Sequence, residues 1–159
     1  MKYALLYIFS LVAVNCAFDV VPLVRLPGGD MWPPVSLAVG FIFVIRDYAQ
    51  REIGHMILPA MLVGGVLSWF MASPAIALAS LCAFMAGELL DWAVYTFTRR
   101  PFSQRILFSS ALGAPMDSAI FLGMLGLFSL SSVLVMTASK MFGALIVFLL
   151  ARRREAVSA

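Results

Sequence analysis

Four ionisable residues lie inside long apolar stretches of the sequence. Glu88 and Asp91 are three residues apart, whereas Asp117 and Lys140 each stand alone near the middle of an apolar run. An ionisable side chain at membrane depth costs roughly 2.5 to 3.5 kcal/mol on insertion scales unless it is paired or faces water. Each of these residues is therefore a candidate for an ion pair, a buried hydrogen bond or a polar path.

A polar stripe continues from the two acidic residues Glu88 and Asp91. Tyr95 and Thr98 follow Asp91 at i+4 and i+7, a spacing that places them on one face of a helix. Such a stripe either hydrogen-bonds to neighbouring helices or faces a cavity. In a cavity, Trp92 beside Asp91 would make the stripe a lined binding site.

Asp117 and Lys140 are natural counter-ions, because each is expected near the midplane of its span. A buried structural salt bridge would offset the cost of inserting the two charges. A solute site at the same depth would use the same residues, so both interpretations remain open. Asn15, in the first apolar run, is a weaker candidate, since an unpaired amide is costly to bury.

A charged segment runs from Arg46 to Glu52 at the end of another apolar stretch. Asp47 and Arg51 are spaced i, i+4, as are Arg46 and Gln50, so a helix end could neutralise its own charges at the membrane interface. Alternatively, this density of charge beside Gln50 could close a gate or bind a polar solute.

The composition places these residues in a membrane protein. Of the 159 residues, 63% are apolar and 12% are charged, and the mean hydropathy is +1.01. Soluble domains are typically about 45 to 50% apolar and about 25% charged. We therefore expect the lipid bilayer as the main partner and no separate soluble domain. The net charge of +3 is too small to indicate nucleic-acid binding.

Turn residues divide the chain into apolar segments of membrane-spanning length. Because a span takes ~20 helical residues, 159 residues hold at most six or seven spans. We predict one all-α transmembrane domain over 1–159, a compact six-helix bundle with spans at about 3–24, 33–53, 56–72, 74–98, 105–126 and 129–151. Small residues at four-residue spacing predict close helix packing, at Ala60, Gly64, Ser68 and Ala72 and at Ala79, Ala83 and Gly87.

Basic residues predict the orientation of these spans. One side of the membrane would hold nine of them, namely Lys2, Arg46, Arg51, Arg99, Arg100, Arg105, Arg152, Arg153 and Arg154. The other side would hold Arg25 alone. By the positive-inside rule, both termini are cytoplasmic. We expect the first apolar run to be a retained span and not a cleaved signal.

Several motifs are missing, which narrows the class of protein. Cys16 and Cys82 lie in apolar runs without metal-ligand spacing, and His55 is a lone histidine, so we expect no metal and no cofactor. There is no phosphate-binding GxxxxGK[ST] loop, no Gly-x-Ser-x-Gly and no His-Glu-x-x-His. We therefore expect a protein that is not an enzyme and does not hydrolyse nucleotide itself.

A combination of segments carries a family resemblance over nearly the whole chain. These are the run from Phe43 to His55 with its Arg-Asp-x-x-Gln-Arg-Glu, the run from Gly87 to Tyr95 with its Glu-x-x-Asp, the turn Arg100-Pro101-Phe102, the element Pro115-Met116-Asp117-Ser118, and Lys140. Together they resemble the VUT (vitamin uptake transporter) family, whose members are described as queuosine precursor transporters.

The resemblance implies a six-helix inner-membrane importer of 7-cyano-7-deazaguanine or a related deazaguanine base. It also implies a fold similar to the substrate-binding subunits of energy-coupling-factor vitamin transporters, acting without the ATPase module. The chain departs from longer members in being compact, which leaves the choice of base open. Two other classes of interpretation remain: a binding subunit of an ATP-driven importer, and a membrane scaffold or enzyme. The chain could also form a homo-oligomer.

The candidate site residues suit such a base. A carboxylate can accept hydrogen bonds from the adjacent N–H groups of the guanine-like edge, and a donor is needed for its carbonyl oxygen. An aromatic side chain such as Phe84 or Trp92 can stack on the ring. We expect the substrate-binding residues to come from the set Asn15, Arg46, Asp47, Gln50, Glu88, Asp91, Trp92, Tyr95, Asp117 and Lys140.

Overall fold

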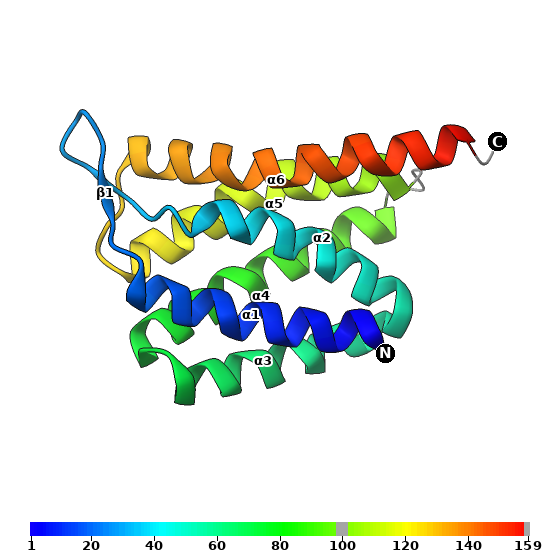
Figure 1. The fold of residues 1–159 in the computed structure, drawn as a ribbon, viewed down its shortest axis with the longest axis horizontal. Helices are drawn as coiled ribbons and strands as arrows, with labels where there is room; N and C mark the ends of the chain where they lie inside the picture. The colour runs from blue at the N-terminus through cyan, green and yellow to red at the C-terminus, as the bar shows by residue number, and fades with distance from the viewer. Residues whose placement is uncertain (98–101, 158–159) are drawn as a thin grey trace.

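A computed structural model describes the backbone of residues 1–97 and 102–157. Within these ranges, the side chains of residues 88, 91–97, 102–107, 109, 144, 147–148 and 150–157 lie outside the described residues. The described chain is almost entirely helical (Figure 1). The helices are α1 (Lys2–Val20), α2 (Ser36–Ile53), α3 (Ile57–Met71), α4 (Pro74–Phe97), α5 (Phe102–Met124) and α6 (Leu130–Val157). A short 3₁₀ helix, η1 (Gly54–Met56), joins α2 to α3, and a hairpin of β1 (Val24–Arg25) and β2 (Met31–Trp32) joins α1 to α2.

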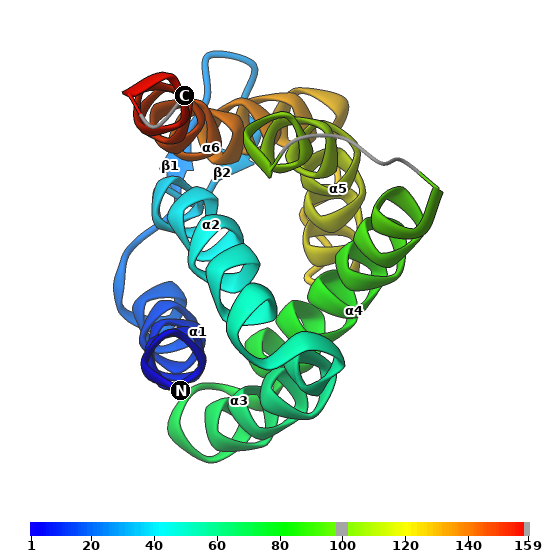
Figure 2. The same cartoon turned by 90° about the vertical axis from the view of Figure 1, so that its right-hand side faces the viewer.

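The helices pack as a closed ring. Going round it, α1 contacts α3, α3 contacts α4, α4 contacts α5, α5 contacts α6, and α6 contacts α2, which returns to α1. Figure 2 shows this ring from the end where the chain starts and α6 finishes. Because α2 meets α6, segments about one hundred residues apart in the sequence share one interface.

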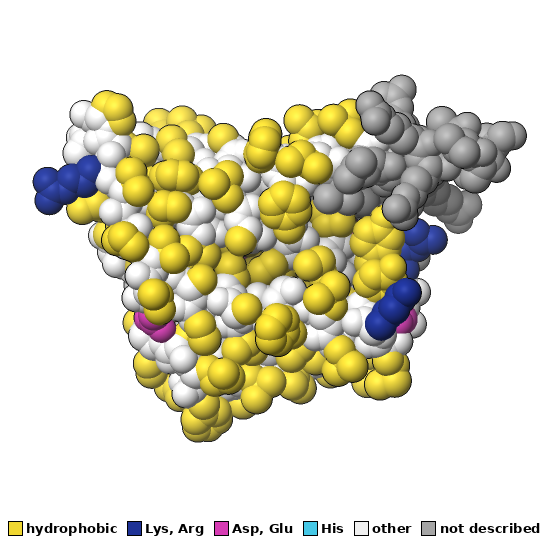
Figure 3. Space-filling view, viewed as in Figure 1, with side chains coloured by type: hydrophobic (Ala, Val, Ile, Leu, Met, Phe, Trp, Pro, Cys, Tyr) yellow, Lys and Arg dark blue, Asp and Glu magenta, His cyan; other side chains and the backbone are white. Residues whose placement is uncertain are grey.

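Polar and apolar side chains are distributed in the opposite way to a soluble protein. Phe9 and Phe70 are 70% and 81% exposed, whereas Asn15, Asp117 and Lys140 are buried. On the face shown in Figure 3, charged side chains lie at the two ends of the long axis, and the surface between them is largely hydrophobic. An exposed apolar surface of this extent needs lipid or a partner to cover it.

Two helical stretches are long and apolar enough to cross a membrane, judged by length and composition over the described residues. They are Lys2–Val20 and the continuous stretch Ser36–Met71. Shorter apolar helical stretches lie at Pro74–Gly87 and Leu130–Gly143. The N-terminus and the C-terminal end of α6 lie at the same end of the molecule, and the hairpin lies at the other (Figure 1).

The first helix ends earlier than the sequence predicts. α1 stops at Val20, whereas we expected helix to about residue 24. Pro22 has no backbone N–H to continue the helical ladder, and Val24 instead pairs with Trp32 in the hairpin. The turn predicted between the first two spans is therefore part of a small β element that the hydropathy pattern did not reveal.

Two other helix ends differ from expectation. α2 begins at Ser36 rather than near residue 33, because Pro33 and Pro34 lie in a preceding turn in which the Pro33 carbonyl accepts from the Ser36 N–H at 3.0 Å. α6 continues to Val157 beyond the predicted end near residue 151. The arginines after Ala151 are good helix formers, so charge ends the apolar stretch without ending the helix.

The hairpin is hydrogen-bonded to the start of α6. The Ser131 hydroxyl donates to the Asp30 carboxylate, and the Ser132 hydroxyl donates to the Met31 carbonyl at 2.7 Å. The Trp32 indole N–H donates to the Ser36 hydroxyl at 3.0 Å. These bonds hold β2 between the beginnings of α2 and α6.

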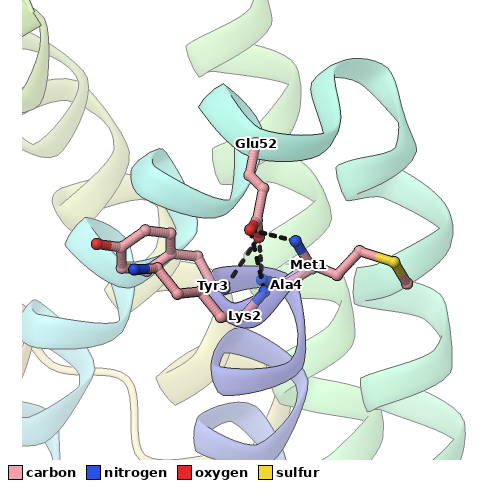
Figure 4. A network of polar contacts seen from close by, with 5 residues as sticks. All are labelled: Met1, Lys2, Tyr3, Ala4 and Glu52. Carbon is pink, nitrogen blue, oxygen red and sulfur yellow. Dashed lines mark hydrogen bonds and ion pairs between the residues drawn. The ribbon is translucent and has the colours of Figure 1, made fainter.

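At the opposite end of the molecule, Glu52 ties α2 to α1 (Figure 4). Its carboxylate accepts hydrogen bonds from the backbone N–H groups of Lys2, Tyr3 and Ala4 at 3.0, 2.9 and 3.1 Å, and it pairs with the ammonium of Met1. The first N–H groups of a helix lack partners within the helix, so Glu52 caps α1 from a different helix.

Candidate functional site

A buried ion pair joins α5 to α6. The Lys140 ammonium donates to the Asp117 carboxylate, and the two residues are 1% and 3% exposed. This is the contact that the sequence analysis expects of two counter-ions. Each charge is neutralised by the other, which offsets part of the cost of removing both from water.

The ion pair lies close to the centre of α5, displaced from it toward the hairpin end. Asp117 is seven residues before the last residue of α5, Met124, which corresponds to about 10 Å along the helix. Pro115, inside α5, has no N–H to donate to the carbonyl of Ala111. The backbone hydrogen bonding of α5 therefore lacks one bond at Pro115, two residues before Asp117.

Two glycines determine how closely α6 approaches α2 beside Lys140. A Cβ atom on Gly40 would lie 2.3 Å from the Lys140 carbonyl oxygen, and one on Gly143 would lie 2.8 Å from the Gly40 carbonyl carbon. The two backbones are thus in direct contact, as small residues allow in membrane helices. The sequence analysis missed this crossing, although Ser36 and Gly40, like Ser139 and Gly143, are small residues four positions apart.

Three hydroxyl groups near the pair have no hydrogen-bond partner among the described residues. They belong to Ser110 and Ser118 on α5 and to Thr137 on α6, and each oxygen is buried. Ser110 is seven residues before Asp117, and Thr137 is three before Lys140, so each shares a helix face with a member of the pair. Buried hydroxyls are normally hydrogen-bonded, and these three therefore retain unused donors and acceptors.

Asn15 lies elsewhere, between α1 and α3. Its amide N–H donates to the Ser68 hydroxyl at 2.9 Å, and that hydroxyl donates to the Gly64 carbonyl at 2.8 Å. A Cβ on Gly64 would lie 2.6 Å from the Leu11 side chain. The predicted seam of small residues on α3 therefore packs against α1, and Asn15 is one of its contacts.

The charged segment of α2 lies about two turns beyond the glycine crossing. Arg46 is 6% exposed and donates from Nη1 to the Asp47 carboxylate at 2.8 Å. Gln50 is partly buried one turn further along α2. Arg46 is six residues past Gly40, about 9 Å along the helix, so this group is separate from the ion pair.

The acidic stripe predicted on α4 lies in its second half. Glu88, Asp91, Trp92 and Tyr95 all fall within Pro74–Phe97, and their side chains lie outside the described residues, as does Thr98. α4 packs against α5, which carries Asp117. A role for these four residues in binding stays a prediction.

Comparison with known proteins identifies the family. The model of a family described as "Putative vitamin uptake transporter" matches residues 35–152, which include α2 to α5, most of α6 and the Asp117–Lys140 pair. No curated protein matches the chain, and no solved structure matches it. The chain belongs to the vitamin uptake transporter family, a family of membrane transporters.

Proposed function

We propose that the protein imports a queuosine precursor, 7-cyano-7-deazaguanine or a related deazaguanine base, across the cytoplasmic membrane. Its family supports the uptake of a small molecule by a transporter rather than an enzyme. The motifs around Arg46, Glu88 and Asp117 resemble those of queuosine precursor transporters. The observation that carries the proposal is the Asp117–Lys140 pair, buried inside a bundle whose outer surface is apolar.

The pair has the chemistry that a guanine-like edge requires. A carboxylate such as Asp117 can accept from the ring N–H and the exocyclic amino group together, and an ammonium such as Lys140 can donate to the carbonyl oxygen. In the structure the two residues neutralise each other. A bound base would exchange this contact for hydrogen bonds to its own edge, so that each charged group keeps a hydrogen-bond partner.

The proposal includes six membrane-crossing helices, α1 to α6, with both ends of the chain in the cytoplasm. The position of both ends on one side of the molecule supports this topology, as does the excess of basic residues expected there. The hairpin that carries Arg25 would then face the outside, and Arg46, Asp47 and Gln50 would lie toward the cytoplasmic end.

Uptake of the labelled base tests this proposal. A bacterial strain that cannot make 7-cyano-7-deazaguanine should gain uptake, and queuosine in its tRNA, when it expresses the chain. Asp117→Asn should abolish both, because an amide presents a donor where the base needs an acceptor. Arg25→Gln is the matched control, since Arg25 is exposed on the hairpin, and it should transport normally.

The absence of uptake by correctly inserted wild-type protein would contradict the choice of substrate. Purified protein in liposomes should carry the base without an ATPase partner, as the family resemblance implies. Activity in cells that disappears in such liposomes would favour the alternative, a binding subunit of an ATP-driven importer.

A further inference from the structure

Among the described residues, an open space lies beside Gly113, on the face of α5 that carries Asp117. Gly113, four residues before Asp117, is buried, yet a Cβ atom built on it would meet no described atom within 4 Å. The buried helical glycines 40, 64, 65 and 143 would each place a Cβ 2.3 to 2.8 Å from another atom. Since protein interiors are close-packed, Gly113 marks a buried place that no described side chain fills.

Unpaired hydroxyls lie on the same stretch of α5, with Ser110 on the face of Gly113 and Asp117 and with Ser118 on the adjoining face, next to Asp117. Ser110 and Ser118 are 3% and 0% exposed, and neither hydroxyl has a partner among the described residues. A helical serine commonly donates to the carbonyl four residues earlier, as Ser68 and Ser139 do here at 2.8 Å. Ser110 and Ser118 do not use this route, so their bonding capacity is available to something else.

The neighbouring helix carries a partly buried glycine, Gly87, at the corresponding level. Gly87 on α4 would place a Cβ with no described atom within 4 Å. α4 and α5 are consecutive packed helices, and Gly87 and Gly113 lie at about the same distance from the connection between them. A glycine at one level on each of two packed helices would give a flat wall, which suits a planar ligand.

We propose that the open space at Gly113 seats the ring of a fused heterocyclic base, with Ser110 and Ser118 as specificity-determining hydrogen-bond partners. This inference rests on the proposed function and adds residues to its site. The edge of the base would meet Asp117 and Lys140, while the glycine wall covers its face. A hydroxyl can donate to a nitrile nitrogen or accept from an amino group, so the two serines read the substituents of the ring.

Cysteine accessibility tests the space itself. In a background with Cys16 and Cys82 replaced by alanine, Gly113→Cys should react with a small water-soluble thiol reagent. Gly123→Cys is the matched control, because Gly123 is on the same helix and also has open space, but is exposed on the surface that would face lipid. We expect at least tenfold faster reaction at position 113, and protection there by 7-cyano-7-deazaguanine. Equal reactivity at the two positions, or reaction at 113 without protection by an imported base, would overturn the proposal.

Filling the space tests its use. Gly113→Leu should lower uptake at least tenfold at unchanged membrane levels, whereas Gly123→Leu should keep the uptake of the wild type. Gly113→Ala is the milder variant if the leucine reduces insertion.

Ser110→Ala and Ser118→Ala should reduce the preference for 7-cyano-7-deazaguanine over 7-deazaguanine, which lacks the nitrile. A preference unchanged in both alanine variants would refute the role of the serines. If the wild type imports neither base, the proposed function is wrong. The reactivity of Gly113→Cys without ligand then still tests whether the space beside Gly113 is open.

Discussion

At the scale of single residues, the Asp117–Lys140 pair makes a prediction about stability. Lys140→Met would leave a buried carboxylate without its counter-ion, and breaking a buried pair typically costs about 3–5 kcal/mol. We expect a lower melting temperature in detergent and less protein in the membrane. Arg25→Met, which removes an exposed charge, should change neither.

The double variant Asp117→Leu/Lys140→Met separates structure from transport. Replacing both members of a buried pair by apolar residues is often neutral or stabilising, so this variant should recover the melting temperature of the wild type. Uptake should remain absent, because the base would find neither acceptor nor donor. A double variant that is stable and still transports would show that the pair serves only to hold α5 against α6.

The sequence predicts the charged part of this site better than its neutral part. Asp117 and Lys140 stand out because a charge in an apolar run needs a partner, and each is the natural candidate for the other. Serine and glycine are common in membrane helices, so nothing in the sequence distinguishes Ser110 or Gly113 from other residues of their kind. Only the packing around them shows which hydroxyl is unpaired and which glycine borders open space.

At the scale of helices, the crossing of α2 and α6 makes the next prediction. Gly40→Ala would place a methyl group 2.3 Å from the Lys140 carbonyl oxygen, against backbone that has little freedom to move. Overpacking typically costs about 1–3 kcal/mol and occasionally more. We expect lower thermal stability and reduced uptake, since α6 must shift and carries Lys140 with it.

Gly123→Ala provides the comparison for this helix crossing. It makes the same chemical change on α5, where a Cβ meets nothing within 4 Å, and alanine favours helix over glycine by about 1 kcal/mol. It should therefore leave stability unchanged or slightly raised. Equal stability of Gly40→Ala and Gly123→Ala in a thermal melt would contradict the close backbone contact.

At the scale of the whole molecule, the sequence predicts the helices but not their arrangement. Proline, glycine and charged residues mark the ends of apolar segments, and these signals place each helix to within a few residues. The ring depends on contacts such as Gly40 with Lys140, which are one hundred residues apart, and no local pattern says which helix lies opposite which. The cap that Glu52 provides for α1 is equally invisible, because it joins two helices through backbone N–H groups that every sequence possesses.

The orientation of the whole molecule is the last prediction. If both termini are cytoplasmic, the hairpin turn faces outside and the α2–α3 turn faces the cytoplasm. Gly28→Cys and His55→Cys, both at exposed positions, should be introduced after Cys16 and Cys82 are replaced by alanine. A membrane-impermeant maleimide should label Gly28→Cys in intact cells and His55→Cys only after permeabilisation, because a single basic residue, Arg25, is expected on the outer side against nine on the inner. The reverse pattern would mean that the protein has the opposite orientation in the membrane. Labelling of both positions in intact cells would mean that α2 does not cross the membrane.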